Sequence, residues 1–453
     1  MNSGLTLTLT AIAATVMIAI IVVVAISSDC SITCASVASA SQKESNITFT
    51  AIFTQLSNSS GMGKRLIEHA LDEIKVKHPH TNIQLKYTEY PSNHSQILNR
   101  IMNQTPVDLV SIDQIWLGEF AQKGLLTDLS NYTQSWGREK DWYEENWAGG
   151  NYKGRVYGIW TWTDIRGIWY WKDLLDKAGV NPHSLKTWDG YLASAKRLNT
   201  VLRPQGIEGV HLTGASHSPD LWYPYLWMLG GDILEQRSGH PKNGVYWFPA
   251  YNSSKGIKAL GFIKDQITKA GIKPQKNHFW GQEFADRKFA VMLEGSWMPV
   301  EFPKNQLENI KQRVGFIPMF PVPTLANKTS TLMGGWELSI PKTSTHKDLA
   351  WELITTMLKP DILEPWLSQN GFLPTQIPIG QGHTLNLTES SSFPYYNEMI
   401  SLIPFGGSRP SIPEYPIIAE HIRQAIDDVY YGIKEPKRAL DDAATRSAKV
   451  LGW

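Results

Sequence analysis

The chain has 453 residues, 42% hydrophobic and 19% charged, a composition typical of a globular protein with a substantial core. Its 43 Lys and Arg residues nearly balance its 42 Asp and Glu residues, giving a net charge of +1. This length accommodates two or three domains. The charge balance excludes the broad basic field that nucleic-acid binding needs, so we expect no nucleic-acid partner.

Residues 1–45 are predicted to be a signal or membrane-anchor segment with a linker. Residues 5–26 carry no charge and are long enough to span a bilayer, whereas a signal-peptide core usually has about 7 to 15 residues. No Lys or Arg precedes this run, and a cleavage-like Ala38-Ser39-Ala40 follows it. An uncleaved anchor is favoured over cleavage. Either outcome places the body at the extracellular face of the cell membrane, anchored or secreted.

The chain has two cysteines, Cys30 and Cys34, both beside the apolar segment. The body therefore has neither a disulfide framework nor a thiolate metal site. A lipid on Cys34 is a further alternative for membrane attachment, but Ser31-Ile32-Thr33 is a poor approach to a lipidated cysteine, so two ordinary thiols are favoured. Acceptor sites of the form N-x-S/T are spread along the chain and predict an exported, glycosylated body. They begin at Asn46, Asn58, Asn93, Asn103, Asn131, Asn252, Asn327 and Asn386.

The body opens with alternating strand and helix patterns. The expected strands are 46–53, 82–90 and 107–113, and the expected helices are 63–77, about 96–102 and 115–124. This order predicts an α/β layer with a parallel-rich sheet, whose ligands sit at the carboxyl ends of the strands. Asp113 lies at such an end, where it either caps the following helix or faces a ligand.

Similar patterns return in the second half of the chain. The expected helices are 172–179, 255–271 and 346–358, and the expected strands are 168–171, 288–297, 314–320 and 332–343. No internal repeat is present. We therefore expect two α/β lobes.

Enzyme motifs give little support to catalysis. Residues 61–65 contain the Gly and Lys of a P-loop without its spacing, and neither HExxH nor GxSxG occurs. No catalytic residue, metal or cofactor is expected. A glycosidase would need two opposed carboxylates, and the sequence leaves candidates open. These are Asp113, Asp164, Glu294 and Glu337.

Tryptophans beside turn residues are the strongest chemical signal among the 18 Trp residues. In GIWTWTDIRGIWYW, residues 158–171, Trp162 stands close to Asp164. A ring face can stack on the C–H face of a sugar, while carboxylates, Arg and backbone N–H groups bind its hydroxyls. Each ring alone fits a core equally well. We interpret the set, which includes Trp162, Trp222, Trp297 and Trp336, as a sugar site.

Seven segments of the body carry a family pattern, in order. They are VDLVSIDQIWLGEFAQKGLLTDLS, GRVYGIWTWTDIRGIWYWKDLLDKAGV, LWYPYLWMLGGDIL, FADRKFAVMLEGSWMP, LMGGWELSIPKTSTHKDLAWELI, GFLPT and RPSIPEYPIIAEHI. The chain resembles, over roughly residues 46–450, the extracellular solute-binding proteins of ABC importers, in the carbohydrate-binding group with the maltose- and trehalose-binding proteins. The resemblance implies a two-lobed, type II periplasmic-binding-protein fold, each lobe a parallel-rich sheet flanked by helices, with a hinge between lobes.

The resemblance also implies domain limits and binding residues. Lobe 1 is expected at 46–157 plus about 320–365, and lobe 2 at 158–319 plus about 366–453. The family's main sugar contacts match Asp113, Trp162, Asp164, Trp297, Gly335, Trp336 and Arg409. Trp222 and Trp227 match further subsite rings, and Trp160 is an additional expected contact. Arg166 is expected to form a structural ion pair.

The function implied by the resemblance is that of a non-enzymatic receptor. It would capture a sugar or oligosaccharide in an aromatic-lined cleft between the lobes and deliver it to ABC importer permease subunits, acting as a monomer. Two features depart from the family pattern: the leader is longer and uncharged, and the loop TQLSNSSGMG lacks the acidic residue that some relatives use. The alternatives are a secreted glycoside hydrolase and a glycosylated surface carbohydrate-binding protein without transport.

Overall fold

The computed structural model describes residues 47–55, 62–89, 92–212, 219–239, 245–275, 281–317, 321–323, 330–381 and 395–453. Residues 46–453 form one compact unit. The predicted anchor, Cys30 and Cys34 lie outside the described residues. Within the described ranges, no helix is both long and apolar enough to cross a membrane.

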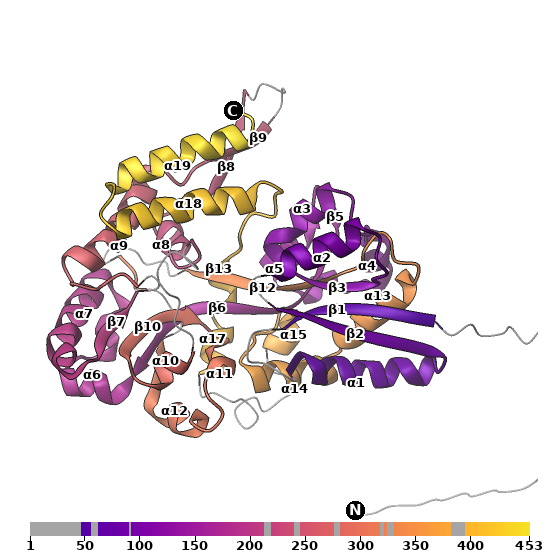
Figure 1. Cartoon of the computed structure of the whole chain (residues 1–453), viewed down its shortest axis with the longest axis horizontal. Helices are drawn as coiled ribbons and strands as arrows, with labels where there is room; N and C mark the ends of the chain where they lie inside the picture. The colour runs from indigo at the N-terminus through magenta and orange to yellow at the C-terminus, as the bar shows by residue number, and fades with distance from the viewer. Residues whose placement is uncertain are drawn as a thin grey trace, which may run out of the picture. The chain divides into compact units, whose positions relative to one another are not determined.

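The first elements follow the predicted alternation of strand and helix. They are β1 Ile47–Gln55, α1 Met62–Lys77, β2 Thr81–Glu89, α2 Asn93–Met102, β3 Leu109–Asp113, η1 Gln114–Trp116 and α3 Leu117–Gln122. In Figure 1, α1 and α2 lie on opposite sides of the sheet made by β1 and β2. Phe49, Thr50, Ala51 and Ile52 of β1 are all buried, as expected of a parallel strand covered on both faces.

The middle of the chain adds a second set of elements. They are α4 Ser130–Trp136, η2 Glu139–Asp141, α5 Glu144–Gly149, β4 Asn151–Tyr152, β5 Arg155–Val156, β6 Ile159–Trp171, α6 Lys172–Ala178, η3 Pro182–Lys186, α7 Trp188–Leu202, η4 Arg203–Gln205, β7 Glu208–His211 and α8 Tyr223–Met228. The prediction divided residues 158–171 into a cleft segment and a strand. In the structure, β6 is one strand from Ile159 to Trp171. Most of its residues are β-branched or aromatic, and pairing with β12 and β10 continues the strand through Asp164, Arg166 and Gly167.

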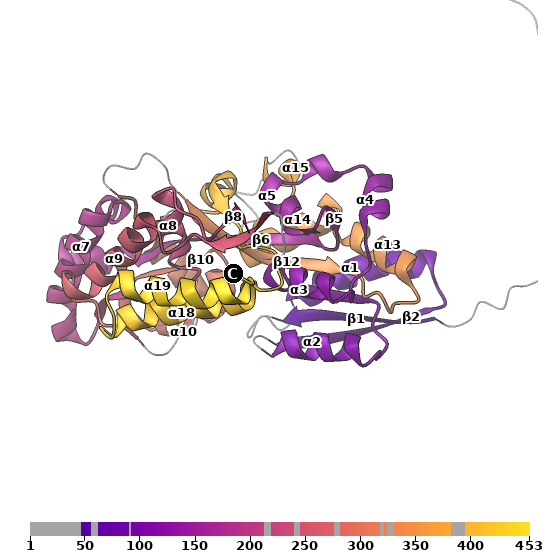
Figure 2. The ribbon, with the colours of Figure 1, turned by 90° about the horizontal axis from the view of Figure 1, so that it is seen from above.

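The remaining elements complete the unit. They are β8 Leu234–Ser238, β9 Val245–Pro249, α9 Ser254–Thr268, α10 Gly281–Ala285, β10 Phe289–Gly295, α11 Met298–Glu301, α12 Leu307–Arg313, β11 Val314–Ile317, β12 Thr331–Ser339, α13 Lys347–Met357, α14 Pro360–Asn370, α15 Ile377–Gly380, α17 Tyr396–Ile400, η6 Ile403–Phe405, β13 Gly406–Gly407, α18 Tyr415–Tyr430 and α19 Pro436–Val450. Helices α18 and α19 lie side by side, seen in yellow in Figure 2.

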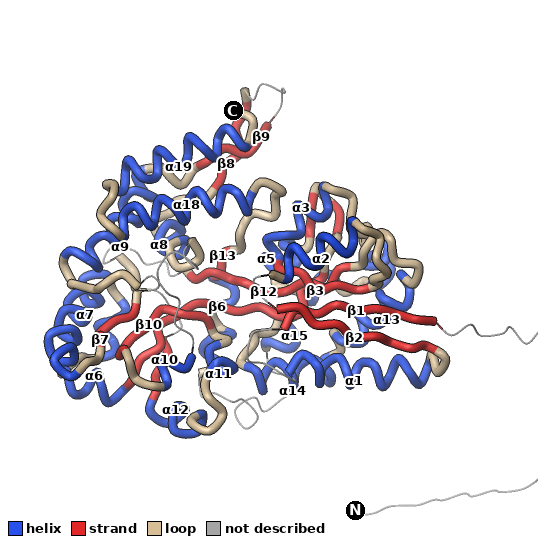
Figure 3. The backbone as a smooth tube through the Cα atoms, viewed as in Figure 1, coloured by secondary structure: helices blue, strands red, loops and turns tan. Residues whose placement is uncertain are grey.

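The main sheet has the strand order β2-β1-β3-β12-β6-β10-β7, with β11 paired to β6 and β13 paired to β12. Its outer pairs are parallel: β1 with β2, β1 with β3, and β10 with β7. At its centre, β12 and β6 run antiparallel to each other and to their other main-path neighbours. Figure 3 shows β6 and β12 running between the two groups of strands, so these two strands connect the halves of the sheet.

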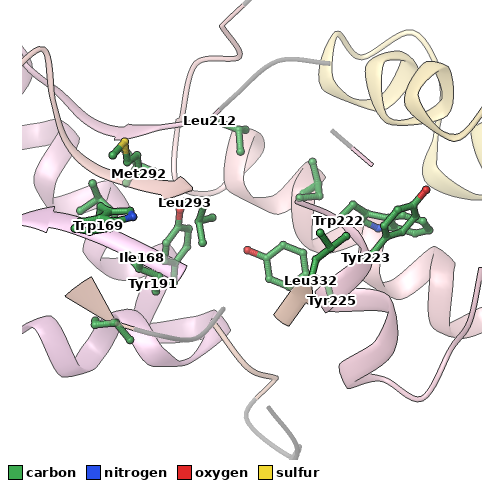
Figure 4. Close-up of a cluster of buried hydrophobic side chains, with 14 of the residues drawn as sticks. Ile168, Trp169, Tyr191, Leu212, Trp222, Tyr223, Tyr225, Met292, Leu293 and Leu332 are labelled. Carbon is green, nitrogen blue, oxygen red and sulfur yellow. The ribbon is translucent and has the colours of Figure 1, made fainter. Parts of the chain in front are cut away.

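The buried apolar side chains form two clusters. The first core includes Phe49 and Leu109, and the second includes Trp169 and the side chains drawn in Figure 4. Both central strands contribute to both clusters: β6 gives Trp162 to the first core and Trp169 to the second, and β12 gives Trp336 to the first and Met333 to the second. The consecutive residues Phe372 and Leu373 also divide between the cores. Among the described residues, β6, β12 and the step from Phe372 to Leu373 therefore each connect the two cores.

Candidate functional site

Three of the predicted ligand residues lie in one row across the centre of the sheet. Trp336 of β12 is paired in register with Asp113 of β3 on one side and with Trp162 of β6 on the other. Residues directly opposite each other on neighbouring strands project from the same face of a sheet. The register thus brings together residues that are more than 200 positions apart in sequence, from 113 to 336.

Alternate residues of β6 extend this row into a charged cluster. Trp162, Asp164 and Arg166 are spaced by two, so they share a face of the strand. Arg166 donates from Nη1 to Oδ1 of Asp164 and from Nη2 to Oδ2 of Asp220, the latter at 3.4 Å. The backbone N–H of Gly334 also donates to Oδ1 of Asp164 at 3.3 Å. The ion pair expected of Arg166 is therefore present.

Arg409 connects this cluster to Asp113, at the end of β3. Its Nη1 donates to Oδ2 of Asp220 at 3.2 Å, and its Nη2 donates to Oδ1 of Asp113 at 3.3 Å. Asp113 also accepts a hydrogen bond from the backbone N–H of Ile115 at 3.3 Å, so it caps η1. Capping, one of the two roles predicted for Asp113, is therefore observed, and the same carboxylate also pairs with Arg409.

The five charged side chains that result are called the charged network. They are Asp113, Asp164, Arg166, Asp220 and Arg409. Asp220 has the most exposed side chain of the five, at 23%, whereas Arg166 and Arg409 are at 9% and 7%. The network is therefore largely withdrawn from water, where charged hydrogen bonds are strong and missing partners are costly.

Burial is the main influence on the pKa of two members of the network, Asp113 and Arg166. Desolvation raises the pKa of Asp113 above its ordinary value, against the attraction of the nearby Arg409. Desolvation also lowers the pKa of Arg166 to about 10, opposed most by Asp220. Arg166 still carries its charge at neutral pH.

Trp297, between β10 and α11, packs its ring against Arg166 of the charged network. Its ring is partly buried, and the guanidinium Cζ of Arg166 lies 4.5 Å from the ring centroid. An Arg over an aromatic face is held by the ring quadrupole as well as by its ion pairs. Trp297 and Arg166 thus fix each other at the edge of the cluster.

Gly335 serves close packing at the crossing of β6 and β12. Its φ is +153°, and a Cβ added there would lie 2.4 Å from the carbonyl oxygen of Trp162. Only glycine allows this approach of two backbones. The position therefore fixes the spacing between Trp162 and Trp336.

Three other predicted tryptophans do not lie in the row. Trp160 is 1% exposed, and its Nε1 donates to Oε1 of the buried Glu337. Trp222 is also 1% exposed and packs in the second core among the side chains of Figure 4. Trp227 is partly buried and lies against Tyr223 and Gly407. In this structure neither Trp160 nor Trp222 presents a ring face to solvent.

The carboxylates proposed for a glycosidase pair are also accounted for. Glu337 is fully buried, and burial raises its pKa well above its ordinary value, with Asp113 adding to the effect. Glu294 lies in β10, opposite Gly167 of β6, and is 5% exposed. Both carboxyl side chains are therefore buried in this structure.

Asp220 is the member of the network that the sequence prediction missed. It lies just before α8 and receives hydrogen bonds from both arginines. A signal existed, since Asp220 stands in a turn beside the segment that begins at Leu221 and matches the family. The prediction followed the neighbouring Trp222, whose size made it conspicuous but whose ring belongs to the core.

Two further predictions concern groups that bind or modify the chain. Across the part of the chain that the structure describes, no group of three or more His, Cys, Asp or Glu could hold a metal ion. Among the acceptor asparagines, Asn103 and Asn131 are exposed, whereas Asn93 is fully buried and is not accessible for glycosylation in the folded chain. Asn46, Asn58, Asn327 and Asn386 lie outside the described residues.

The architecture defines the class of protein. Two apolar cores joined by β6 and β12, with charged and aromatic side chains at the crossing, make a two-lobed α/β binding protein. The family model described as bacterial extracellular solute-binding protein matches residues 57–363, and the chain belongs to this family.

Known proteins agree with this membership. The chain is 24% identical over 307 residues to the arabinooligosaccharide-binding protein of Bacillus subtilis, covering 65% of this chain and 66% of the relative. It also superposes on an ABC transporter solute-binding protein of Thermotoga lettingae TMO bound with alpha-D-tagatose, with a TM-score of 0.75, 23% identity, and coverage of 90% and 100% of the two chains. Maltose-bound T. maritima MalE3 gives a TM-score of 0.73, 21% identity, and coverage of 89% and 100%. The predicted fold class is confirmed.

Proposed function

We propose that this protein captures a sugar or oligosaccharide outside the cytoplasmic membrane and delivers it to the permease of an ABC importer. Three similar proteins support a sugar as the ligand, since they bind an arabinooligosaccharide, tagatose and maltose. The residues at the crossing suit such a ligand, because a neutral polyol offers hydroxyls to charged groups and C–H faces to aromatic rings.

The observation that carries the proposal is the ion pair between Asp113 and Arg409. Asp113 ends a strand of the first core, and Arg409 precedes α18, whose apolar side chains belong to the second core. A ligand that bound both residues would favour one arrangement of the two halves over others, as a receptor that signals occupancy by closing requires. We place the ligand at Asp113, Trp162, Asp164, Trp297, Gly335, Trp336, Arg409 and Asp220.

The lobe boundaries follow from the same proposal. We assign residues 46–157 with about 320–365 to lobe 1, and 158–319 with about 366–453 to lobe 2. The distribution of the two cores supports the divisions at β6 and β12. Beyond residue 365, Trp366, Leu367, Phe372 and Ile379 still pack in the first core. A monomeric body completes the proposal. It is either anchored to the membrane by residues 1–45, through an uncleaved segment or a lipid, or secreted.

A thermal-shift screen over mono- and oligosaccharides tests the proposed ligand class. A sugar that binds the native state raises the melting temperature by mass action, and titration calorimetry then gives its affinity. Maltose, alpha-D-tagatose and arabinooligosaccharides are the first probes. A panel of sugars without any shift or calorimetric signal would contradict the assignment.

The absence of catalysis is a separate part of the proposal. The protein is incubated with the oligosaccharide that it binds, and the mixture is analysed by chromatography. A receptor returns its ligand intact, whereas the glycoside hydrolase alternative produces shorter sugars. Copurification with permease subunits distinguishes a transport receptor from a surface protein without transport.

A further inference from the structure

The short segment 409–411, which carries Arg409, is hydrogen-bonded to η1, the turn of helix that follows β3. Gln114 of η1 is fully buried, and its Nε2 donates to the carbonyl oxygen of Arg409 at 3.0 Å and to Oγ of Ser411. A carbonyl oxygen can only accept, so the nitrogen of the Gln114 amide must face Arg409. Ser411 in turn donates to the carbonyl oxygen of Gly149 at 3.2 Å.

The packing around this segment leaves little freedom for it to move. A Cβ added to Gly118 of α3 would lie 2.5 Å from the carbonyl oxygen of Ser411 and 2.9 Å from the carbonyl carbon of Ile412. The backbone of the segment therefore rests directly on α3. Hydrogen bonds from Gln114 and close packing on Gly118 act on the same few residues from two neighbouring elements.

Adjacent residues at the end of β3 thus hold the two parts of Arg409. Asp113 accepts a hydrogen bond from the guanidinium at 3.3 Å, and Gln114 donates to the main-chain carbonyl at 3.0 Å. An arginine side chain has many rotamers, so ordering its guanidinium costs conformational entropy. Fixing the main chain of Arg409 reduces this cost. The same guanidinium also donates to Asp220 at 3.2 Å. It reaches both carboxylates only when the main chain of Arg409 is held in one position.

We infer that Gln114 is a positioning residue for Arg409: its side-chain amide fixes the main chain so that the guanidinium lies between Asp113 and Asp220. Gln114 is not among the residues that meet the ligand, and it acts on binding only through Arg409. This inference rests on the proposed function for its effect on affinity, but not for its effect on the position of Arg409.

The chain offers a matched control. Gln376 is also fully buried, its Nε2 donates to the carbonyl oxygen of Leu358 at 2.9 Å, and among the described residues its Oε1, like that of Gln114, has no hydrogen-bond partner. Gln114→Met and Gln376→Met therefore remove the same kind of bond at similar volume. Of these two glutamines, Gln114 donates to the segment 409–411, whereas Gln376 donates to Leu358.

Ligand-free crystal structures of both variants test the positioning directly. In Gln114→Met, the segment at 409–411 is expected to shift and the guanidinium of Arg409 to leave hydrogen-bond distance of Asp113 or Asp220. In Gln376→Met, Arg409 is expected to stay in place. A guanidinium that keeps both contacts in Gln114→Met would overturn the inference, whatever the ligand is.

A double-mutant cycle tests the effect on binding, with maltose, alpha-D-tagatose and arabinooligosaccharides as probes in calorimetry. Gln114→Met removes the hydrogen bonds to Arg409 and Ser411 and should weaken sugar binding about three- to tenfold, whereas Gln376→Met should leave it unchanged. Arg409→Gln should weaken it more, and adding Gln114→Met to Arg409→Gln should change nothing further.

The outcomes separate the inference from the proposed function. If Arg409→Gln weakens sugar binding and Gln114→Met does not, or if the two effects simply add, the inference is wrong and the proposed function stands. If the wild type binds no sugar, or Arg409→Gln binds as the wild type does, the proposed site is wrong. The crystal structures then still decide whether Gln114 positions Arg409.

Discussion

The guanidinium of Arg166 lies over the ring of Trp297, with its Cζ 4.5 Å from the ring centroid, while it pairs with Asp164 and Asp220. One side chain thus combines a cation–π contact with two ion pairs in a nearly dry environment. Its removal would leave the buried Asp164 without its cationic partner, and such a loss is far more costly inside a protein than at its surface.

We expect Arg166→Met to lower the free energy of unfolding by about 3 kcal/mol, because a buried carboxylate loses its cationic partner. Arg138→Met is the control: Arg138 also lies over a tryptophan, Trp136, and pairs with Asp141, but its side chain is 37% exposed. Its loss should cost no more than about 1 kcal/mol. Urea denaturation measures both, and equal losses would contradict the importance given to burial.

Trp336→Ala is expected to weaken sugar binding by at least about 1 kcal/mol, because the ring face is lost. Trp247→Ala removes a ring that is 38% exposed in the β8–β9 pair and should leave the affinity unchanged. Since Trp336 also packs edge-on against Trp116, Trp336→Phe serves as a milder variant that keeps part of the core. Calorimetry on folded protein gives the result, and unchanged affinity in both Trp336 variants would count strongly against the proposed site.

Gly335→Ala should destabilise the protein by at least about 2 kcal/mol, because its φ of +153° and the nearby Trp162 carbonyl leave no room for a Cβ. Gly261→Ala is the matched change in α9, where a Cβ would meet nothing within 4 Å. There the gain in helix propensity should stabilise the protein by about 0.5 to 1 kcal/mol. Thermal unfolding should therefore move in opposite directions, and a harmless Gly335→Ala would contradict the close approach.

The stability contributed by Glu337 should depend on pH with a defined sign. Burial raises the pKa of Glu337 in the folded state, so the folded protein binds its proton more tightly than the unfolded chain does. The contribution is fully present below the unfolded pKa of about 4.3 and is lost as pH rises through the folded pKa. Glu337→Gln cannot ionise, so the variant should gain stability over the wild type as pH rises from about 4 toward neutrality.

Glu119 provides the opposite case. Its hydrogen bond to His94, followed by the bond to Lys123, lowers its pKa to about 2 against the effect of burial. The stability that it contributes is present above the unfolded pKa and is lost as pH falls through about 2. Glu119→Gln should therefore lose stability relative to the wild type as pH rises from about 2 to about 5, and the difference should stay constant above that range. Denaturant unfolding from pH 2 to 8 covers both ranges. Stability changes of the same sign in the two variants would contradict the opposite pKa shifts of Glu337 and Glu119.

Much of the fold could be predicted from local pattern. Apolar residues at helical spacing located α1 and α9, and the expected strands at 46–53 and 107–113 match β1 and β3 within a few residues. These elements depend on short-range periodicity, which a sequence displays directly. The family segments likewise located Asp113, Trp336 and Arg409, because each stands in a short motif of the chain.

The sequence by itself determined the α/β class, the exported character expected of the chain and the residue types suited to a sugar. Only the tertiary structure decided which of these residues meet. The pairing of β12 with β3 and β6 sets Trp336 beside Asp113 and Trp162, and the fold brings Asp220 between two arginines while it takes Trp160 and Trp222 into the core. The physical reason is that strand register and burial depend on partners far apart in the chain, whereas hydrophobic periodicity depends only on near neighbours.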